Sequence, residues 1–214
     1  INMKKILSLL IPLSLQAQDV PIGAWKDYLS YNSASYIAEA NDKIYCVANE
    51  GLFFIQKSDG TINRVSKITG LSDIGVRQVA HSQELQSIII VYENCNIDLL
   101  KENKIINLSD IKRKEFTGIK IINNITIKNS IAYLSSSLGL ILVDLENEEI
   151  KDTYTVGNEY SMYGIHGCAF LGDSIIVATS EGLFYANTNS QNLSDYNNWT
   201  ALTEHTNEET YDNI

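Results

Sequence analysis

The sequence predicts an all-β protein, a β-propeller, and three observations carry this prediction. The stretch KIYCVANEGLFFI at Lys43–Ile55 returns in variant form three more times along the chain. Aligning the copies places Gly51, Asn96, Gly139 and Gly182 at one position, separated by 45, 43 and 43 residues. Helical periodicity is absent, whereas short apolar runs recur throughout the sequence. A repeat of this length built from short strands is typical of propeller blades.

The repeated stretch has the pattern of a β-hairpin. Residues 44–48 alternate between two faces, as the side chains of a strand do. Glu50–Gly51 then turns the chain, because glycine accepts the positive φ that tight hairpins require. Asn96 fills the glycine position of the second copy, since asparagine tolerates positive φ better than most residues. Residues 52–55 return as the second strand, and a further turn at 57–60 closes the unit.

Two further strands complete each repeat, so one period predicts a blade of four antiparallel strands. The other copies of the hairpin lie at Ile89–Leu100, Ser130–Val143 and Ser174–Ala186. An apolar first strand precedes each hairpin, at Tyr36–Ala40, Val76–Ala80, Lys120–Ile125 and Gly167–Phe170. Polar turns join these first strands to the hairpins at Asn41–Asp42, Ser82–Leu85, Ile127–Asn129 and Gly172–Asp173. The outermost strands are less apolar, as in Thr61–Ile68 and Lys151–Val156.

The number of repeats raises the question of how the ring closes. Propellers have about four to eight blades, so four units could close on themselves or belong to a larger ring. We expect about four blades of a ring of about seven. The segment Thr200–Ile214 would then lead into a fifth unit, and a strand near Trp25–Tyr31 would complete the last blade of the full ring.

The N-terminus has the pattern of a secretory signal peptide at residues 1–17. Ile1–Asn2 precede the expected start at Met3, and Lys4–Lys5 form a basic region before the apolar run Ile6–Leu15. A run of about ten apolar residues is too short to span a bilayer, so we expect export rather than membrane insertion. Residues 18–214 are expected to form the partial propeller domain.

The charge of the chain excludes some partners. Without the two lysines of the signal peptide the chain carries 14 basic and 26 acidic residues, a net charge of about −12. Such an acidic surface argues against binding to nucleic acid or to an anionic membrane. The basic run Lys112–Lys114 is interpreted as a solvated loop in preference to a binding patch.

The cysteines and tryptophans are interpreted mainly as packing residues. Cys46, Cys95 and Cys168 fall in different repeats, and strands of different blades rarely approach closely enough for a disulfide. Small buried apolar fillers are therefore favoured over one disulfide and a spare thiol. Trp25 and Trp199 are expected to pack between blades, with stacking on a sugar or a partner as the alternative.

The sequence contains no motif that predicts chemistry. His81, His166 and His205 have no histidine or cysteine partner at metal-ligand spacing. Glycine-rich phosphate loops are absent, and neither a nucleophile triad nor a carboxylate pair can be selected from the many candidates. We therefore predict a protein that is not an enzyme, with no catalytic, cofactor or metal residues, and the sequence does not identify ligand-binding residues.

Several unusual phrases of the chain resemble one known family. They are GAWKDYLSY (Gly23–Tyr31), KIYCVANEGLFF, GLSDIGV (Gly70–Val76), VYENCNIDLL (Val91–Leu100), GLILVDLENEEIKDTYTVG (Gly139–Gly157) and NLSDYNNWT (Asn192–Thr200). In this order they resemble the N-terminal β-propeller of PorZ proteins, cell-surface components of the type IX secretion system of Bacteroidota. The resemblance extends over essentially the whole chain after residue 17.

The resemblance implies a location, partners and a function. It implies export to the outer-membrane cell surface and a complex with the sortase PorU and with PorV and PorQ. This complex joins secreted cargo to anionic lipopolysaccharide, which PorZ is thought to bind and supply to the sortase. The hairpin repeats also resemble the extracellular propellers of hybrid two-component sensors, so a ligand-sensing propeller of a histidine kinase is the alternative. No residue is implied as a catalytic or binding site.

Overall fold

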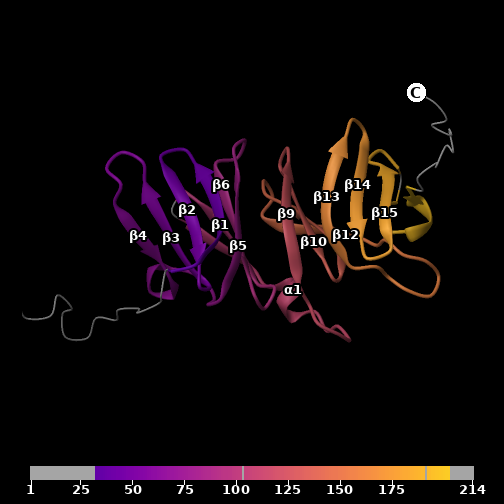
Figure 1. The fold of residues 1–214 in the computed structure, drawn as a ribbon, viewed down its shortest axis with the longest axis horizontal. Helices are drawn as coiled ribbons and strands as arrows, with labels where there is room; N and C mark the ends of the chain where they lie inside the picture. The colour runs from indigo at the N-terminus through magenta and orange to yellow at the C-terminus, as the bar shows by residue number, and fades with distance from the viewer. Residues whose placement is uncertain (1–31, 103, 191, 203–214) are drawn as a thin grey trace, which may run out of the picture.

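The computed structural model describes residues 32–102, 104–190 and 192–202. The strands in this part form four separate antiparallel sheets of four strands each, in chain order (Figure 1). We refer to these sheets as blades 1 to 4. Blade 1 contains β1 (Ala34–Ala40), β2 (Lys43–Ala48), β3 (Gly51–Gln56) and β4 (Ile62–Val65). Blade 2 contains β5 (Val76–Ser82), β6 (Ser87–Tyr92), β7 (Ile97–Lys101) and β8 (Lys104–Leu108).

The second pair of blades repeats the same arrangement. Blade 3 contains β9 (Ile122–Lys128), β10 (Ile131–Ser136), β11 (Gly139–Asp144) and β12 (Glu149–Tyr154). Blade 4 contains β13 (Ile165–Leu171), β14 (Ser174–Thr179), β15 (Gly182–Asn187) and β16 (Thr200–Ala201). The short helices are η1 (Lys67–Thr69), α1 (Asp110–Arg113) and η2 (Tyr196–Asn198). The predicted propeller blades are confirmed.

The first strand of each blade contacts the first strand of the next. β1 packs beside β5, β5 beside β9, and β9 beside β13. Side chains also cross between these strands: Gln78 Nε2 donates to Asn123 O at 2.6 Å, and Asn123 Nδ2 donates to Ile165 O at 2.7 Å. The blades are therefore arranged around an axis on the side of their first strands, as in a propeller.

Three apolar cores lie between successive blades. Tyr45, Val47 and Leu52 of blade 1 pack with Val79, Ile88, Ile90 and Tyr92 of blade 2. Ile89, Val91, Ile97 and Leu99 pack on the other side of blade 2 with Ala132, Leu134, Ile141 and Val143 of blade 3. Leu140 and Leu142 pack with Ile165, Ile175, Val177 and Trp199 of blade 4. Since each core is shared by two blades, stability depends mainly on contacts between neighbours.

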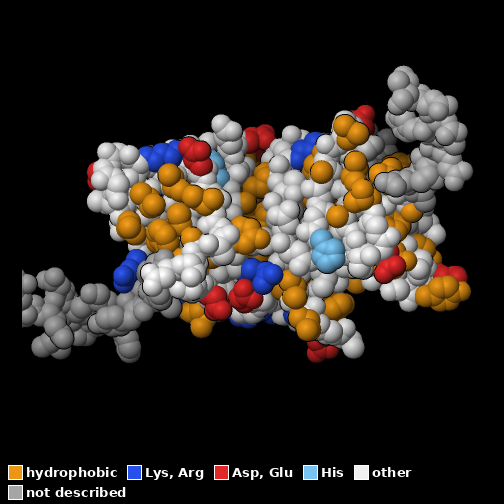
Figure 2. Space-filling model, in the orientation of Figure 1, with side chains coloured by type: hydrophobic (Ala, Val, Ile, Leu, Met, Phe, Trp, Pro, Cys, Tyr) orange, Lys and Arg blue, Asp and Glu red, His pale blue; other side chains and the backbone are white. Residues whose placement is uncertain are grey.

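Blades 1 and 4 each have a second face that no described blade covers. Ile37 and Ile62 on blade 1 are 70% and 66% exposed, and Leu171 on blade 4 is 72% exposed. Figure 2 shows hydrophobic side chains gathered over β1–β3 and over β13–β15 on the two sides of the molecule. Among the described blades, the uncovered apolar faces are therefore those of blades 1 and 4.

Some predicted boundaries were wrong. β9 begins at Ile122 and runs to Lys128, where the sequence analysis placed a first strand at Lys120–Ile125 and a turn at Ile127–Asn129. The outer strand expected at Thr61–Ile68 is shorter, since β4 ends at Val65 and the helix η1 follows it. The outer strand expected at Lys151–Val156 is β12, which begins at Glu149 and ends at Tyr154. Thr200–Ala201 belong to blade 4, since Ala201 pairs with Phe184, so they do not begin a fifth unit.

The hairpin turns differ in detail from the predicted ones. Asn49 and Glu50 both have positive φ, 45° and 62°, and Gly51 is already in β3. In the second repeat Cys95 has the positive φ of 61° and Asn96 does not. The prediction that Gly51 and Asn96 hold the positive φ was therefore wrong. Gly139 and Gly182 do have positive φ, 106° and 117°.

The remaining expectations at the two ends concern residues that the structure does not describe. The signal peptide, Trp25, the strand near Trp25–Tyr31 and His205 lie outside the described residues. Within the described residues, no helix has the length and apolar character needed to cross a bilayer.

Candidate functional site

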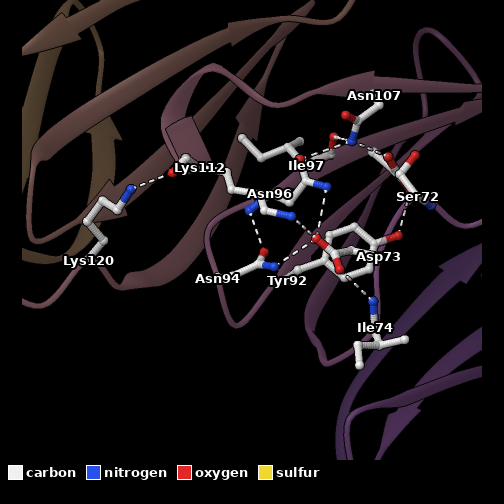
Figure 3. Close-up of polar contacts among 11 residues, drawn as sticks. Ser72, Asp73, Ile74, Tyr92, Asn94, Asn96, Ile97, Asn107, Lys112 and Lys120 are labelled. Carbon is white, nitrogen blue, oxygen red and sulfur yellow. Dashed lines mark hydrogen bonds and ion pairs between the residues drawn. The ribbon is translucent and has the colours of Figure 1, made fainter. Parts of the chain in front are cut away.

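A cluster of polar side chains joins three segments at the end of the blades near α1. Asp73 comes from the connection between β4 and β5, Asn94 and Asn96 from the turn between β6 and β7, and Lys112 from α1 (Figure 3). Asp98 and Asn107 of blade 2 lie beside them. We call these residues, with Ser72 and Tyr92, the blade-2 polar cluster.

Asp98 is the buried centre of this cluster. Its side chain has no exposed surface, and its carboxylate accepts hydrogen bonds from the Tyr92 hydroxyl at 2.5 Å and from the Ser72 N–H at 2.9 Å. Asn107 Nδ2 donates to the other carboxylate oxygen at 2.8 Å. Burial and the hydrogen bond to Asp98 raise the pKa of Tyr92 well above its usual range. The tyrosine is thus fixed as a hydrogen-bond donor.

Asp73 binds the three segments together. Its Oδ2 accepts from Lys112 Nζ at 2.6 Å, from Asn94 Nδ2 at 2.7 Å and from Asn96 Nδ2 at 3.3 Å. Burial opposes ionisation, but hydrogen bonds from Lys112 and Asn94 outweigh it and lower the pKa of Asp73 to about 2. The lysine ammonium supplies the positive charge at this carboxylate, so the cluster is built as a structural cross-link.

Lys120 closes the loop that follows α1. Its ammonium donates to the carbonyl oxygens of Ile111, Lys112 and Lys114 at 3.1, 2.6 and 2.9 Å. These carbonyl groups at the end of a helical turn lack partners within the helix, and a lysine satisfies them well. The loop from α1 to β9 is therefore held on both sides, by Lys112 and by Lys120.

His81 lies in hollows at the opposite end of the blades, near the turns that follow β1 and β5. One hollow of about 470 Å³ is lined by Glu39, Asn41, Lys57, His81 and Gln83. Burial lowers the pKa of His81, and a hydrogen bond to the Glu39 backbone partly offsets this effect. Lys57 Nζ pairs with the Glu39 carboxylate at 2.5 Å, so the charges of this hollow are already paired.

The structure separates the other residues considered in the sequence analysis. His166 is exposed on blade 4, away from His81 in blade 2. Cys46, Cys95 and Cys168 are free thiols, the first two buried, and burial raises the pKa of all three. In the described ranges, no group of three or more histidine, cysteine or acidic side chains is arranged to hold a metal ion.

The structure describes two further regions that the sequence analysis interpreted, Trp199 and the basic run Lys112–Lys114. Trp199 is buried and its Nε1 donates to Leu193 O at 3.0 Å, which confirms the expected packing role. The run Lys112–Lys114 is exposed, but Lys112 and Arg113 lie in α1 and pair with Asp73 and Asp110. The expected solvated loop is thus exposed as predicted, but part of it forms the short helix α1.

Sequence reasoning did not find the blade-2 polar cluster. All its members except Asn107 and Lys112 fall in two of the quoted phrases, GLSDIGV and VYENCNIDLL. In the second phrase Asn94, Asn96 and Asp98 alternate with apolar residues after a strand. This alternation of Asx residues was the available signal. It was missed because each residue alone is a common turn former.

The fold and the cluster together define the class of protein. The described chain is a run of propeller blades whose polar side chains hold the connecting loops in place, so its class is that of the β-propeller proteins. The family follows from sequence: a family model described as the type IX secretion system PorZ N-terminal β-propeller domain matches residues 44–200. The chain belongs to this family.

Solved structures give the same fold. PorZ, described as an essential bacterial surface component of the type IX secretion system of Porphyromonas gingivalis, aligns with a TM-score of 0.74 and 29% identity. That alignment covers 82% of this chain and 23% of PorZ, so the chain spans about a quarter of the length of this relative. No curated protein sequence matches the chain.

More distant structures share the fold alone. The extracellular domain of a putative one-component system from B. thetaiotaomicron has a TM-score of 0.61 at 17% identity, over 81% of this chain and 24% of that one. AztD from Citrobacter koseri has a TM-score of 0.53 at 16% identity, over 72% and 43% of the two chains. These similarities show that the blade arrangement is common to proteins of different roles.

Proposed function

We propose that this chain is part of a non-enzymatic component of the type IX secretion system. In this role it acts at the outer-membrane cell surface and assists the sortase that anchors secreted cargo. The observation that carries the proposal is the family match over residues 44–200, which includes both phrases of the blade-2 polar cluster. The surface location given for the solved PorZ supports it.

The chemistry of the described residues supports a binding role in place of catalysis. Asp73 and Asp98, the carboxylates of the blade-2 polar cluster, are occupied by hydrogen bonds from the chain itself. Desolvation raises the pKa of the buried thiols of Cys46 and Cys95, which makes them poor nucleophiles at neutral pH. A scaffold needs such fixed side chains, whereas a catalytic acid or nucleophile must reach its substrate.

The proposal includes export and a larger ring. The signal peptide at residues 1–17 would direct export, and residues 18–214 would form part of a propeller of about seven blades. The uncovered apolar faces of blades 1 and 4 support a ring in which further blades pack against them. The expected partners are the sortase PorU, PorV and PorQ.

Deleting the gene tests the main proposal. In the deletion strain we expect cargo to be synthesised and exported to the periplasm, but to remain unprocessed or unattached. The full-length gene supplied on a plasmid should restore attachment. Normal cargo attachment in the deletion strain would contradict the proposal.

Anionic lipopolysaccharide is the proposed ligand, and it requires a separate test. A chain with a net charge of −10 does not attract an anionic polymer through its overall field. Binding would therefore depend on local hydrogen bonds to sugar groups, and we expect the affinity to rise modestly from low to physiological salt, because salt screens the repulsion between the two negative charges. Titrating the full-length protein with lipopolysaccharide from the same strain measures this. Lipopolysaccharide without the anionic polysaccharide is the control, and equal binding of both would argue against the proposed ligand.

The second candidate is the ligand-sensing propeller of a hybrid two-component histidine kinase. The structural similarity to extracellular domains of sensor systems supports it, at 17% and 15% identity. The coding sequence that follows residue 214 distinguishes the two. A transmembrane helix and a kinase domain would favour the sensor, and a second propeller followed by a β-sandwich would favour the secretion component.

A further inference from the structure

An extra residue interrupts the first strand of every described blade at the same place. The first strands β1, β5, β9 and β13 lie side by side in this order (Figure 1). In each blade, the pairing with the second strand skips the residue that directly follows the first residue of the strand, which forms a β-bulge. The skipped residues are Ser35, Arg77, Asn123 and His166. We call them the bulge residues.

The bulge residues of blades 2 and 3 fasten each blade to the next one along the chain. Arg77 Nε donates to the carbonyl oxygen of Ile122 at 3.0 Å, and Asn123 Nδ2 donates to the carbonyl oxygen of Ile165 at 2.7 Å. Ile122 and Ile165 are the first residues of β9 and β13, and both are almost completely buried. The same hydrogen bond therefore joins the same two positions of the repeat across two successive interfaces.

The interface between blades 1 and 2 shows what this bond requires. The bulge residue there is Ser35, whose short side chain donates to Val47 O in its own blade at 3.4 Å. Blades 1 and 2 are joined one residue further along, where Gln78 Nε2 donates to the Tyr36 hydroxyl oxygen at 2.9 Å. A bulge residue thus needs a longer side chain with a nitrogen donor to reach the next blade.

His166 is the bulge residue of blade 4, and it is exposed in the part of the chain that the structure describes. Its ring nitrogens Nδ1 and Nε2 lie as many bonds from Cα as Nδ2 does in asparagine and Nε does in arginine. The next residue, Gly167, has no side chain, so it cannot make the bond that Gln78 makes at the corresponding position of blade 2. His166 therefore has both the position and the reach to bind a following blade.

The repeat indicates which residue supplies the acceptor. The three described connections from an outer strand to the next first strand have 10, 13 and 10 residues and are 66–75, 109–121 and 155–164. The first strands that follow them begin at the β-branched residues Val76, Ile122 and Ile165. The outer strand of blade 4 ends at Ala201, and a connection of 12 residues, 202–213, leads from it to the β-branched Ile214. Ile214 thus matches both the spacing and the residue type.

We propose that His166 donates a hydrogen bond to the backbone carbonyl oxygen of Ile214, the first residue of a fifth blade that packs beside β13. The proposal rests on the larger ring included under the proposed function and names a contact that continues it. The bond has a clear energetic role, because a backbone carbonyl buried between blades is costly without a donor. The exposed apolar face of blade 4, which carries Leu171, is the surface that this blade would cover.

Intramolecular photo-crosslinking of the full-length protein tests which segment lies against His166. A diazirine amino acid replaces His166 or, separately, Asn123, and the crosslinked fragments are identified by mass spectrometry after chymotryptic digestion. The Asn123 position should crosslink to the fragment that contains Ile165, which serves as the positive control. We expect the His166 position to crosslink to the fragment that contains Ile214. With the control positive, a crosslink to blade 1 or to another segment, or the absence of a crosslink, would overturn the proposal.

Three substitutions of His166 in the full-length protein test the hydrogen bond itself. His166→Asn keeps a donor like that of Asn123, so the melting temperature of the propeller should stay within about 1 °C of wild type. His166→Ala and His166→Leu remove the donor, and each should lower the melting temperature by about 2–4 °C, although leucine retains the volume. Asn123→Ala is the matched control and should cause a similar fall. Equal melting temperatures of the Asn and Leu variants would overturn the hydrogen bond.

The two measurements are independent of the proposed role in secretion. The gene deletion tests that role through cargo attachment, which does not depend on the strand that begins the fifth blade. Failure of the crosslink together with loss of attachment in the deletion strain would reject the His166 contact and keep the secretion role.

Discussion

At the scale of single residues, Asp98 is the polar group on which blade 2 depends most. It is fully buried, and removing its carboxylate would leave the Tyr92 hydroxyl and the Ser72 N–H without their acceptor. We expect Asp98→Ala to lower the free energy of unfolding by about 3 kcal/mol. Urea denaturation of the full-length protein measures this loss. The exposed pair of Asp110 and Arg113 provides the control, since Asp110→Ala should cost under about 1 kcal/mol. Equal losses in the two variants would contradict the assignment.

The other carboxylate of the cluster makes stability depend on pH. The pKa of Asp73 lies at about 2 in the folded protein, below its ordinary value of 3.8. The ionised carboxylate therefore contributes stability above about pH 4, and this contribution, of about 2 kcal/mol, is lost as the pH falls from 4 toward 2. We expect Asp73→Asn to make the free energy of unfolding less dependent on pH in this range. Denaturation curves between pH 2 and 5 test it, with Asp110→Asn as the control. A variant with the same pH dependence as wild type would contradict the prediction.

At the scale of the hairpin, Gly139 and Gly182 occupy equivalent positions of two repeats, but only Gly139 lies against the backbone of a neighbouring strand. A Cβ at Gly139 would lie 2.4 Å from Tyr154 O, whereas a Cβ at Gly182 would meet no atom within 4 Å. Both have positive φ, so both Gly→Ala changes introduce backbone strain of about 1 kcal/mol. We expect Gly139→Ala to be more destabilising than Gly182→Ala by a further 1–3 kcal/mol, roughly, because β12 must move. Melting temperatures of the two variants measure the difference, and equal shifts would argue against the close contact.

The elements also show what the sequence could and could not predict. The alternation of apolar and polar residues and the repeat spacing of 43–45 residues predict the four hairpins. The alternation arises because one face of each strand packs against the next blade. The position of positive φ at Cys95 in place of Asn96 could not be predicted, since it follows from the burial of the Asn96 side chain against Asp73 and Asn107. The blade-2 polar cluster was missed for a related reason: Asp73 and Lys112 are 39 residues apart, and only the packed blades bring them together.

At the scale of the whole molecule, the uncovered faces of blades 1 and 4 predict how the chain behaves alone. Ile37 and Leu171 lie on these faces and would be covered in a larger ring. We expect residues 18–214 expressed alone to be weakly stable or aggregated, because exposed apolar sheet faces associate. The full-length protein should fold cooperatively. Size-exclusion chromatography and thermal melting test this, and a monodisperse, sharply melting 18–214 protein would show that the four blades suffice.

The distribution of the cysteines gives the molecule built-in reporters of blade separation. Cys95 is 1% exposed in the core between blades 2 and 3, and Cys168 packs against the core between blades 3 and 4. A thiol reagent reaches the buried Cys95 sulfur readily only after local opening, whereas Cys168 is partly exposed and has a basal labelling rate. For both thiols the increase in labelling rate reports how often the neighbouring interface separates. Comparing the two rates would order the interfaces by their opening free energies without any substitution. A nascent or damaged ring would then be recognised by its chemical reactivity before its shape has visibly changed.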